Sequence, residues 1–207
     1  MKKYFIGGSI VALLLFSSMI CGAAQAAEPQ VVSVGVKGNE RVTANYILGV
    51  VETKAGESID RDKLQRDIEA IYSQGFFSFV DVDLSVNPEG VEVVYSVREN
   101  PIVEEITFTG NTVYKSETLM NEVFTQVGSV FNRVFFRNDL DRIQDKYHKD
   151  GYVMVRVADV NVQGGRIDVK IVEPRVGDII IQGNKKTKTK VIRREIKLQR
   201  GDLFNIT

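Results

Sequence analysis

The chain has 207 residues, of which 43% are hydrophobic and 26% are charged, a composition typical of globular domains and not of disordered or fibrous proteins. Lysine and arginine together number 27, as do aspartate and glutamate, so the net charge is zero. No overall basic field therefore favours nucleic acid as a partner.

Residues 1–26 have the pattern of a secretory signal peptide. Two lysines precede an apolar stretch from Tyr4 to Ile20, and small residues follow, which predicts cleavage between Ala26 and Ala27. The alternative, a membrane anchor, is disfavoured because glycines and serines interrupt the stretch. The only cysteine, Cys21, lies in this segment. The mature chain is thus expected to be exported and to fold without disulfides.

The first expected domain covers residues 31–100 and opens with a short strand of alternating valines. Gly38 and Asn39 follow as a turn, because both residue types tolerate positive φ. Thr43 is expected to cap a first helix, whose buried positions we place at Ile47, Val50 and Val51.

A second helix is expected after Asp60. Its apolar positions share one helical face and are Leu64, Ile68, Ile71 and Tyr72. Gly75 is expected to end this helix in the left-handed conformation. Two alternating runs, 79–86 and 91–97, surround an Asn-Pro-Glu-Gly turn and predict a hairpin.

The second expected domain, residues 101–175, follows the same order with two differences. Ser116 is expected to cap its first helix and Asn138 its second, which places about four additional residues between the helices; Gly151 ends the second helix. In the first hairpin strand the apolar phase switches near Ala158 and Asp159, which predicts a β-bulge. The bulge is either functional or only protects the edge from aggregation.

Residues 176–207 read as an incomplete third copy. Its expected parts are a strand at Ile179–Ile181 and a helix marked by Ile192 and Ile196. The hairpin that would close a core does not follow by Thr207, so we expect the natural protein to continue. The basic stretch 185–200 could contact anionic lipid, but a loop and the polar face of a helix are the simpler interpretation.

Three phrases therefore recur along the chain, and the first of them, a Gly-Asn turn, does so at spacings of 72 and 73 residues. They are the turns Gly38-Asn39, Gly110-Asn111 and Gly183-Asn184, the helix ends Gly75-Phe76 and Gly151-Tyr152, and the hairpin ends Val97-Arg98-Glu99 and Ile171-Val172-Glu173. This series resembles the POTRA (polypeptide-transport-associated) domain. The implied fold class is α+β: tandem β-α-α-β-β modules, each a three-stranded mixed sheet with two helices on one face.

Tandem copies of this kind are most similar to the periplasmic arm of the BamA-like family of outer-membrane-protein assembly factors. The resemblance implies a non-enzymatic arm on the periplasmic side of the outer membrane of a diderm bacterium. Its implied partners are unfolded outer-membrane proteins, lipoprotein subunits of the assembly machinery, and the membrane itself through a C-terminal barrel that this sequence lacks. Alternatives are the arm of a two-partner-secretion transporter and a stand-alone periplasmic scaffold or chaperone-like module.

The mechanism that the resemblance implies is β-augmentation, in which an extended client pairs with a free sheet edge through its main chain. The first hairpin strand of each module is the expected edge. The residues expected to bind are Phe79, Val80, Asp81 and Val82 in the first copy, and Val155, Arg156, Val157, Ala158 and Asp159 in the second.

Catalytic and metal sites are not expected. The lone His148 has no cysteine partners, and the adjacent Glu104 and Glu105 point to opposite faces of a strand. Neither a phosphate-binding loop nor a nucleophile motif occurs, so we expect no cofactor.

Overall fold

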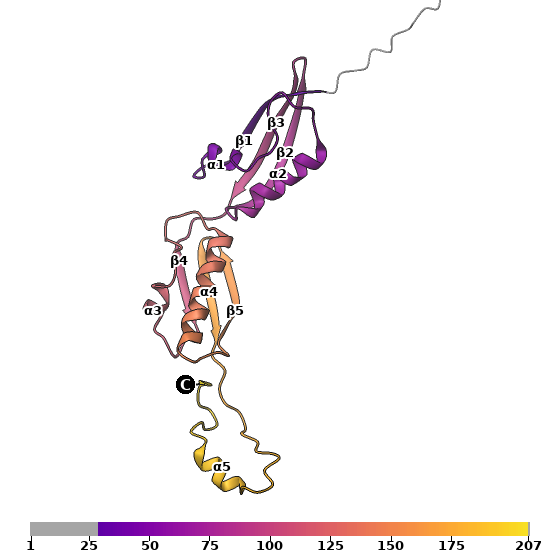
Figure 1. Cartoon of the computed structure of the whole chain (residues 1–207). Helices are drawn as coiled ribbons and strands as arrows, with labels where there is room; N and C mark the ends of the chain where they lie inside the picture. The colour runs from indigo at the N-terminus through magenta and orange to yellow at the C-terminus, as the bar shows by residue number, and fades with distance from the viewer. Residues whose placement is uncertain (1–28, 207) are drawn as a thin grey trace, which may run out of the picture.

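A computed structural model describes residues 29–206 and shows a row of similar modules along one long axis (Figure 1). The fold class expected from sequence is confirmed, because two modules each contain a three-stranded mixed sheet and two helices. The expected signal peptide, with its cleavage site at Ala26 and Ala27, lies outside the described residues.

The first module builds its sheet around a central last strand. Its elements are β1 (Val31–Lys37), α1 (Ala44–Leu48), α2 (Arg61–Ser73), β2 (Phe77–Asn87) and β3 (Gly90–Glu99). β1 pairs in parallel with β3, and β2 pairs antiparallel with it on the other side. Ile47 of α1, Ile71 of α2 and Val93 of β3 belong to one core, so both helices cover the same face of the sheet.

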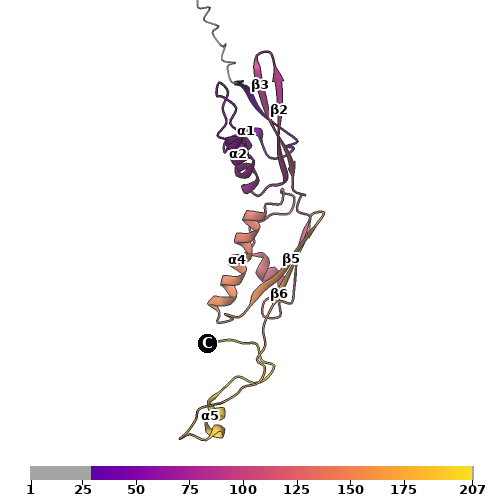
Figure 2. The same cartoon turned by 90° about the vertical axis from the view of Figure 1, so that its right-hand side faces the viewer.

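The second module repeats this topology. Its elements are β4 (Glu105–Thr109), α3 (Ser116–Met120), α4 (Arg133–Lys149), β5 (Arg156–Gln163) and β6 (Arg166–Val172). β6 is central, parallel to β4 and antiparallel to β5. Figure 2 shows α2 and α4 on the same side of their sheets, so the two modules present their open sheet faces in a common direction.

The second long helix begins earlier than expected. α4 starts at Arg133 because the Asn132 side chain accepts hydrogen bonds from the amides of Val134 and Phe135 at 2.9 and 3.0 Å. Asn138 therefore lies inside the helix, and its prediction as the cap was wrong. Residues 133–136, expected to lie between the helices, form the first turn of α4, and Phe136 is its buried side chain.

The additional residues of the second module lengthen its helix and not its linker. α4 has 17 residues and α2 has 13, while both caps, Asp60 and Asn132, lie four residues after the equivalent glycines Gly56 and Gly128. The additional turn therefore lies at the C-terminal end of α4. It carries Tyr147, which is fully buried.

Three smaller expectations about the helices were also wrong. Val50 and Tyr72 are exposed, because α1 ends at Leu48 and the α2 face turns away from the core at its last turn. Ser116 is the first helical residue of α3; the cap is Lys115, which makes no side-chain capping bond. Asp60, in contrast, caps α2 as predicted, accepting from the amides of Asp62 and Lys63.

Residues 174–206 contain one helix, α5 (Thr189–Glu195), and an isolated β-bridge between Arg175 and Leu203. The strand expected at Ile179–Ile181 is not formed. In the complete modules this strand pairs with the last hairpin strand, and no such strand lies within 174–206. Among the described residues, 29–206, no helix combines the length and apolar character needed to cross a membrane.

Candidate functional site

The first expected binding edge, β2, lies at the free edge of the first sheet. Val80 and Val82 pack against the core, while Phe79 is on the open face with the Arg98 guanidinium 5.7 Å from its ring centroid. The Val82 amide donates a 2.8 Å hydrogen bond to the Asp81 carboxylate of its own strand. An incoming strand that needs this amide would have to displace Asp81.

The second expected edge, β5, is also a free edge, and the predicted bulge is confirmed. Val157 pairs with Ile171 and Asp159 with Lys170, so Ala158 is the inserted residue. The insertion lets Val157 and Val160 both pack against the core despite their odd spacing. Arg156 is exposed at the start of the strand, whereas Val155 precedes the strand and is buried, so its assignment to the edge was wrong.

The Gly-Asn turns form one structure that occurs three times. In each, the asparagine side-chain amide donates to the carbonyl three residues later, at 2.8 to 2.9 Å. The glycines have φ between +81° and +84°. These six residues are Gly38, Asn39, Gly110, Asn111, Gly183 and Asn184.

Close packing explains why glycine is needed at the second of these turns. A Cβ on Gly110 would lie 2.1 Å from the carbonyl oxygen of Ile171, at the end of the hairpin. The same approach occurs at Gly38, 2.2 Å from Val97, but a Cβ on Gly183 would meet no atom within 4 Å. The turn thus fits against the last hairpin strand of its own module.

The hairpin-end glutamates hold the loops that follow these turns. The Glu99 carboxylate accepts from the amide of Val42 at 2.8 Å, and Glu173 accepts from the amide of Val113 at 3.0 Å and from the Tyr147 hydroxyl at 2.8 Å. Burial raises the pKa of Glu173, but the hydrogen bonds it accepts outweigh burial and hold that pKa below its ordinary value. The repeated glutamate is therefore explained as a loop anchor.

Two buried aspartates were missed by the sequence analysis. Asp67 on α2 accepts from the amide and hydroxyl of Thr53, the amide of Glu52 and the hydroxyl of Tyr95. Burial raises its pKa, yet these hydrogen bonds outweigh burial and keep the pKa of Asp67 below its ordinary value.

Asp139 on α4 occupies the equivalent position in the second module. It accepts from the amide and hydroxyl of Thr125 and the amide of Phe124, and Arg142 donates to it at 2.8 Å. The threonine and aspartate are separated by 14 residues in both modules, a repeated spacing that could have revealed the pair from sequence.

The junction between the two modules joins the end of α2 to the start of α4. The Asn132 side-chain amide donates to the Gln74 carbonyl at 2.8 Å, and the Arg133 amide donates to the Gly75 carbonyl at 3.1 Å. Asn100 donates to the carbonyls of Gly75 and Phe131, both at 2.9 Å. Gly75 has φ +87°, as expected of a glycine that ends a helix in the left-handed conformation, and its carbonyl also accepts a hydrogen bond from the next module.

Side chains strengthen this junction. The Arg133 guanidinium lies 3.6 Å from the Tyr72 ring centroid and donates to the Tyr72 carbonyl at 2.7 Å. Phe135 of α4 packs edge-on against Phe76, with 5.8 Å between ring centroids. The same backbone pattern recurs at Gly151, whose carbonyl accepts from the Ile206 amide at 3.1 Å.

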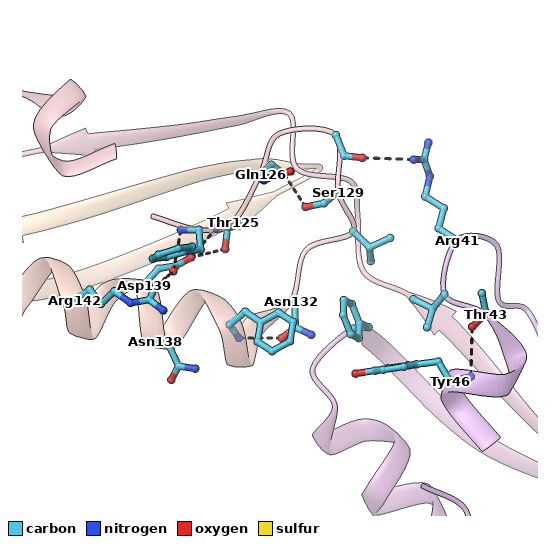
Figure 3. A pocket seen from close by; sticks show the side chains of 16 residues that line it. Arg41, Thr43, Tyr46, Thr125, Gln126, Ser129, Asn132, Asn138, Asp139 and Arg142 are labelled. Carbon is cyan, nitrogen blue, oxygen red and sulfur yellow. Dashed lines mark hydrogen bonds and ion pairs between the residues drawn. The ribbon is translucent and has the colours of Figure 1, made fainter. Parts of the chain in front are cut away.

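Beside the junction lies a cleft of about 910 Å³ (Figure 3). One wall comes from Arg41, Thr43 and Tyr46 of the first module, and the other from the loop and helix around Ser129 and Asn138 of the second. Sequence reasoning did not find this cleft, because it depends on how two modules meet.

The described residues contain no group of three histidine, cysteine, aspartate or glutamate side chains that could hold a metal ion. The buried carboxylates Asp67 and Asp139 are saturated by internal donors, so their geometry is that of structural anchors. What the sites offer a ligand is free strand edge and an apolar cleft, both suited to binding a polypeptide.

Comparison with known proteins points to one family. Residues 29–100, 101–173 and 174–207 match the family model described as "POTRA: Surface antigen variable number repeat". The outer membrane protein assembly factor BamA of Nitratidesulfovibrio vulgaris is 25% identical over 127 residues, covering 61% of this chain and 16% of that protein. The BamA of Neorickettsia risticii is 21% identical over 201 residues, covering 93% and 26%. The chain thus spans about a quarter or less of these curated relatives.

Solved structures agree with the sequence matches. The N-terminal domain of Omp85 from Thermosynechococcus elongatus superposes with a TM-score of 0.68 at 25% identity, covering 85% of this chain and 79% of that one. POTRA1-3 of the periplasmic domain of Omp85 from Anabaena gives 0.65 at 26% identity, with coverage of 86% and 80%.

Proposed function

The chain belongs to the POTRA family, and we propose that it is the periplasmic arm of a factor that assembles β-barrel proteins in the outer membrane. The proposal is supported by BamA relatives that match up to 93% of the chain and by the Omp85 periplasmic domains that share its fold. In this proposal the arm is exported and continues into a membrane barrel beyond these residues. The arm performs no chemistry.

The clients are unfolded outer-membrane proteins, bound by β-augmentation, and lipoprotein subunits dock on the same kind of edge. The observation that carries this proposal is β2, an edge strand of 11 residues that alternates regularly from Phe79 onward. Its last apolar side chains, Leu84 and Val86, are exposed. Main-chain pairing is nearly independent of client sequence, which suits a binder of many precursors.

The two edges are not equivalent in this proposal. β2 accepts clients, because the Val82 amide on its free edge is covered only by the Asp81 carboxylate, which a client strand can displace. β5 is shorter, with eight residues, and its bulge at Ala158 interrupts the register that a long client strand requires. β2 also has an irregularity, between Phe77 and Phe79, but it lies at the start of the strand and leaves residues 79–87 in continuous register. We therefore assign the first hairpin edge to extended clients and leave the second for shorter partner segments.

The edge is tested by titrating the mature chain with a peptide from a barrel strand and following backbone amides by NMR. We expect Val80 and Val82 to shift and to gain protection from exchange. Asp81→Ala should tighten binding about threefold, since the competing carboxylate is removed. Asp83→Ala is the matched control, because Asp83 bonds Ser96 and Lys37 on the open face. Unchanged β2 amides at saturating peptide would contradict the proposal.

The attachment to a membrane barrel is tested separately in the source bacterium. An antibody against residues 101–175 should detect a large outer-membrane protein whose gel mobility changes on heating, as folded barrels do. A soluble periplasmic band of the size of this chain would overturn the role as a membrane-attached arm, while leaving the edge experiment unaffected.

A further inference from the structure

The cleft between the first two modules has the size and walls of a binding site. Its volume of about 910 Å³ lies within the range of ligand pockets, 300 to 1,000 Å³. It is lined by the loop and short helix 41–46, by the loop 124–130, and by the first half of α4. No sheet edge contributes to these walls, so a ligand here binds through side chains and not by strand addition.

Aromatic side chains make the cleft apolar while remaining accessible. Tyr46 is 50% exposed, Phe135 is 53% exposed and Phe124 is 69% exposed. Phe76 also lines the cleft and packs edge-on with Tyr46 and Phe135, at 5.9 and 5.8 Å between ring centroids. A cluster of exposed rings drawn from two modules is typical of interaction sites and not of an ordinary surface.

The charged groups of the cleft are two arginines and one aspartate. Asp139 is buried and already accepts from Thr125, Phe124 and Arg142, so it does not present free charge. Arg142 spans Asp139 and the Phe124 ring, 4.0 Å from the ring centroid. The lining therefore carries a net positive charge.

Arg41 is the group with donors to spare. Its guanidinium is exposed at the rim and makes one hydrogen bond, to the Gly128 carbonyl at 3.5 Å, the limit of such a bond. Figure 3 shows this side chain reaching from the first module across to the opposite wall. The donors of an arginine form a planar fork that matches a carboxylate, so Arg41 is suited to bind an acidic group.

We propose that this cleft binds a short acidic peptide segment that carries a large apolar side chain. The apolar side chain enters between Tyr46, Phe124 and Phe135, and a neighbouring carboxylate pairs with Arg41. The cleft is pre-organised, because the Asn132 and Asn100 hydrogen bonds fix the two walls relative to one another. The site is independent of the strand edges and of the proposed client binding there.

The test uses a fluorescently labelled hexapeptide, Glu-Phe-Pro-Glu-Phe-Pro, whose prolines prevent it from extending a sheet. Binding to the mature chain is measured by fluorescence anisotropy. Two matched peptides replace Glu by Lys or Phe by Ala. We expect saturable binding of the acidic aromatic peptide alone, weakened by salt.

Variants locate the site. Arg41→Gln should weaken binding about tenfold, and Phe124→Ser about fivefold. Arg61→Gln removes an exposed arginine of the same module that does not line the cleft, and should leave binding unchanged. Circular dichroism of each variant checks that the fold is intact.

Three results would overturn the proposal: no saturable binding at millimolar peptide, equal binding of the lysine peptide, or binding that survives both Arg41→Gln and Phe124→Ser. Vesicles containing phosphatidylglycerol provide one more comparison. If they bind in an Arg41-dependent way and the peptide does not, the cleft takes an anionic lipid and the peptide assignment is wrong.

Discussion

The two complete modules use the same framework but bury their tyrosines against different carboxylates. In the first, Tyr95 of the central strand β3 donates to Asp67 at 2.6 Å. In the second, Tyr147 of α4 donates to Glu173 at 2.8 Å, and Arg142 takes a place beside Asp139. Both tyrosines are fully buried.

The difference teaches that the additional turn of α4 has a structural use. It extends the helix until Tyr147 reaches the hairpin-end glutamate, which in the first module, as Glu99, holds its loop through backbone amides. A buried hydroxyl needs an acceptor, so moving the tyrosine moves the hydrogen bond to the nearest carboxylate. The framework tolerates this exchange because both carboxylates already anchor loops.

The largest expected loss of stability comes from the Gly-Asn turn, which in both modules packs against the end of the last hairpin strand. Gly110→Ala should destabilise the second module by about 4 kcal/mol, since it combines positive φ with a contact of 2.1 Å to the Ile171 carbonyl. Gly128→Ala is the matched control in the same module, also at positive φ but in open space, and should cost about 1 kcal/mol. Hydrogen exchange followed by mass spectrometry reports each module separately; equal losses would contradict the packing argument.

Substitution of the buried aspartates should destabilise the two modules to different extents. Asp67→Ala leaves two amides and the fully buried Tyr95 hydroxyl without an acceptor and should cost about 3 kcal/mol. Asp139→Ala should cost about 2 kcal/mol, because its donors from Phe124 and Thr125 reach solvent more easily. Hydrogen exchange in each module measures both values. If Asp139→Ala is the more damaging, the tyrosine is not what makes the first network stronger.

Acid should act on both modules through Asp67 and Glu173. Each has a folded-state pKa below its unfolded value of about 3.9 or 4.3, so its stabilisation is present above that value and is lost as pH falls through the folded pKa. Asp67→Asn should flatten this loss in the first module only. The free energy of unfolding of each module, measured by urea denaturation at several pH values between 7 and 2, checks this prediction. If Asp67→Asn leaves the pH dependence of the stability of the first module unchanged, the prediction is wrong.

Smaller effects should follow from the tyrosines themselves. Tyr147→Phe should cost the second module about 1.5 kcal/mol, because Glu173 loses a donor. It should also raise the pKa of Glu173, which carboxyl-detected NMR can follow. Tyr95→Phe should have a similar cost in the first module and raise the pKa of Asp67 instead. A change of stability or of carboxyl pKa in the module that does not carry the substitution would show that the modules are not independent.

The junction should give the smallest change in stability. Asn132→Asp keeps the acceptor that caps α4 but replaces the donor to the Gln74 carbonyl by an oxygen. We expect a loss of about 1 kcal/mol and wider motion between modules, measured as a broader distance distribution between spin labels on each. Asp60→Asn, the same exchange in reverse at the first cap, is the control and should leave that distribution unchanged.

Local patterns predicted much of each module. The alternating runs, the Asp60 cap and the β-bulge at Ala158 all follow from side-chain phase and turn chemistry within a few residues. The Asn132 cap was missed because the apolar residues after it do not resemble a first helical turn, whereas Asn138 precedes a regular apolar series.

The rest could not be read locally. Asp67 and Asp139 occupy helix positions where an aspartate is usually solvated, and only the fold brings a threonine to each. The cleft and the junction arise from contacts between modules, such as Phe76 with Phe135, whose sequence positions carry no periodic signal. Local physics therefore specified the unit, and the assembly of units required the structure.

The asparagine at the junction has a consequence for building arms of other lengths. Asn132 and Asn205, 73 residues apart, each donate at 2.8 Å to the carbonyl of the residue that directly follows the long helix of the module before, Gln74 after α2 and Asp150 after α4. The acceptors are backbone atoms, which every such helix end supplies whatever its sequence. A module whose long helix is capped by asparagine should therefore dock on any module that ends in a helix followed by glycine. A module whose helix is capped by aspartate, as at Asp60, would instead place a carboxylate oxygen against the carbonyl oxygen of the module before. Modules could thus be added, removed or exchanged by recombination with the docking geometry already encoded.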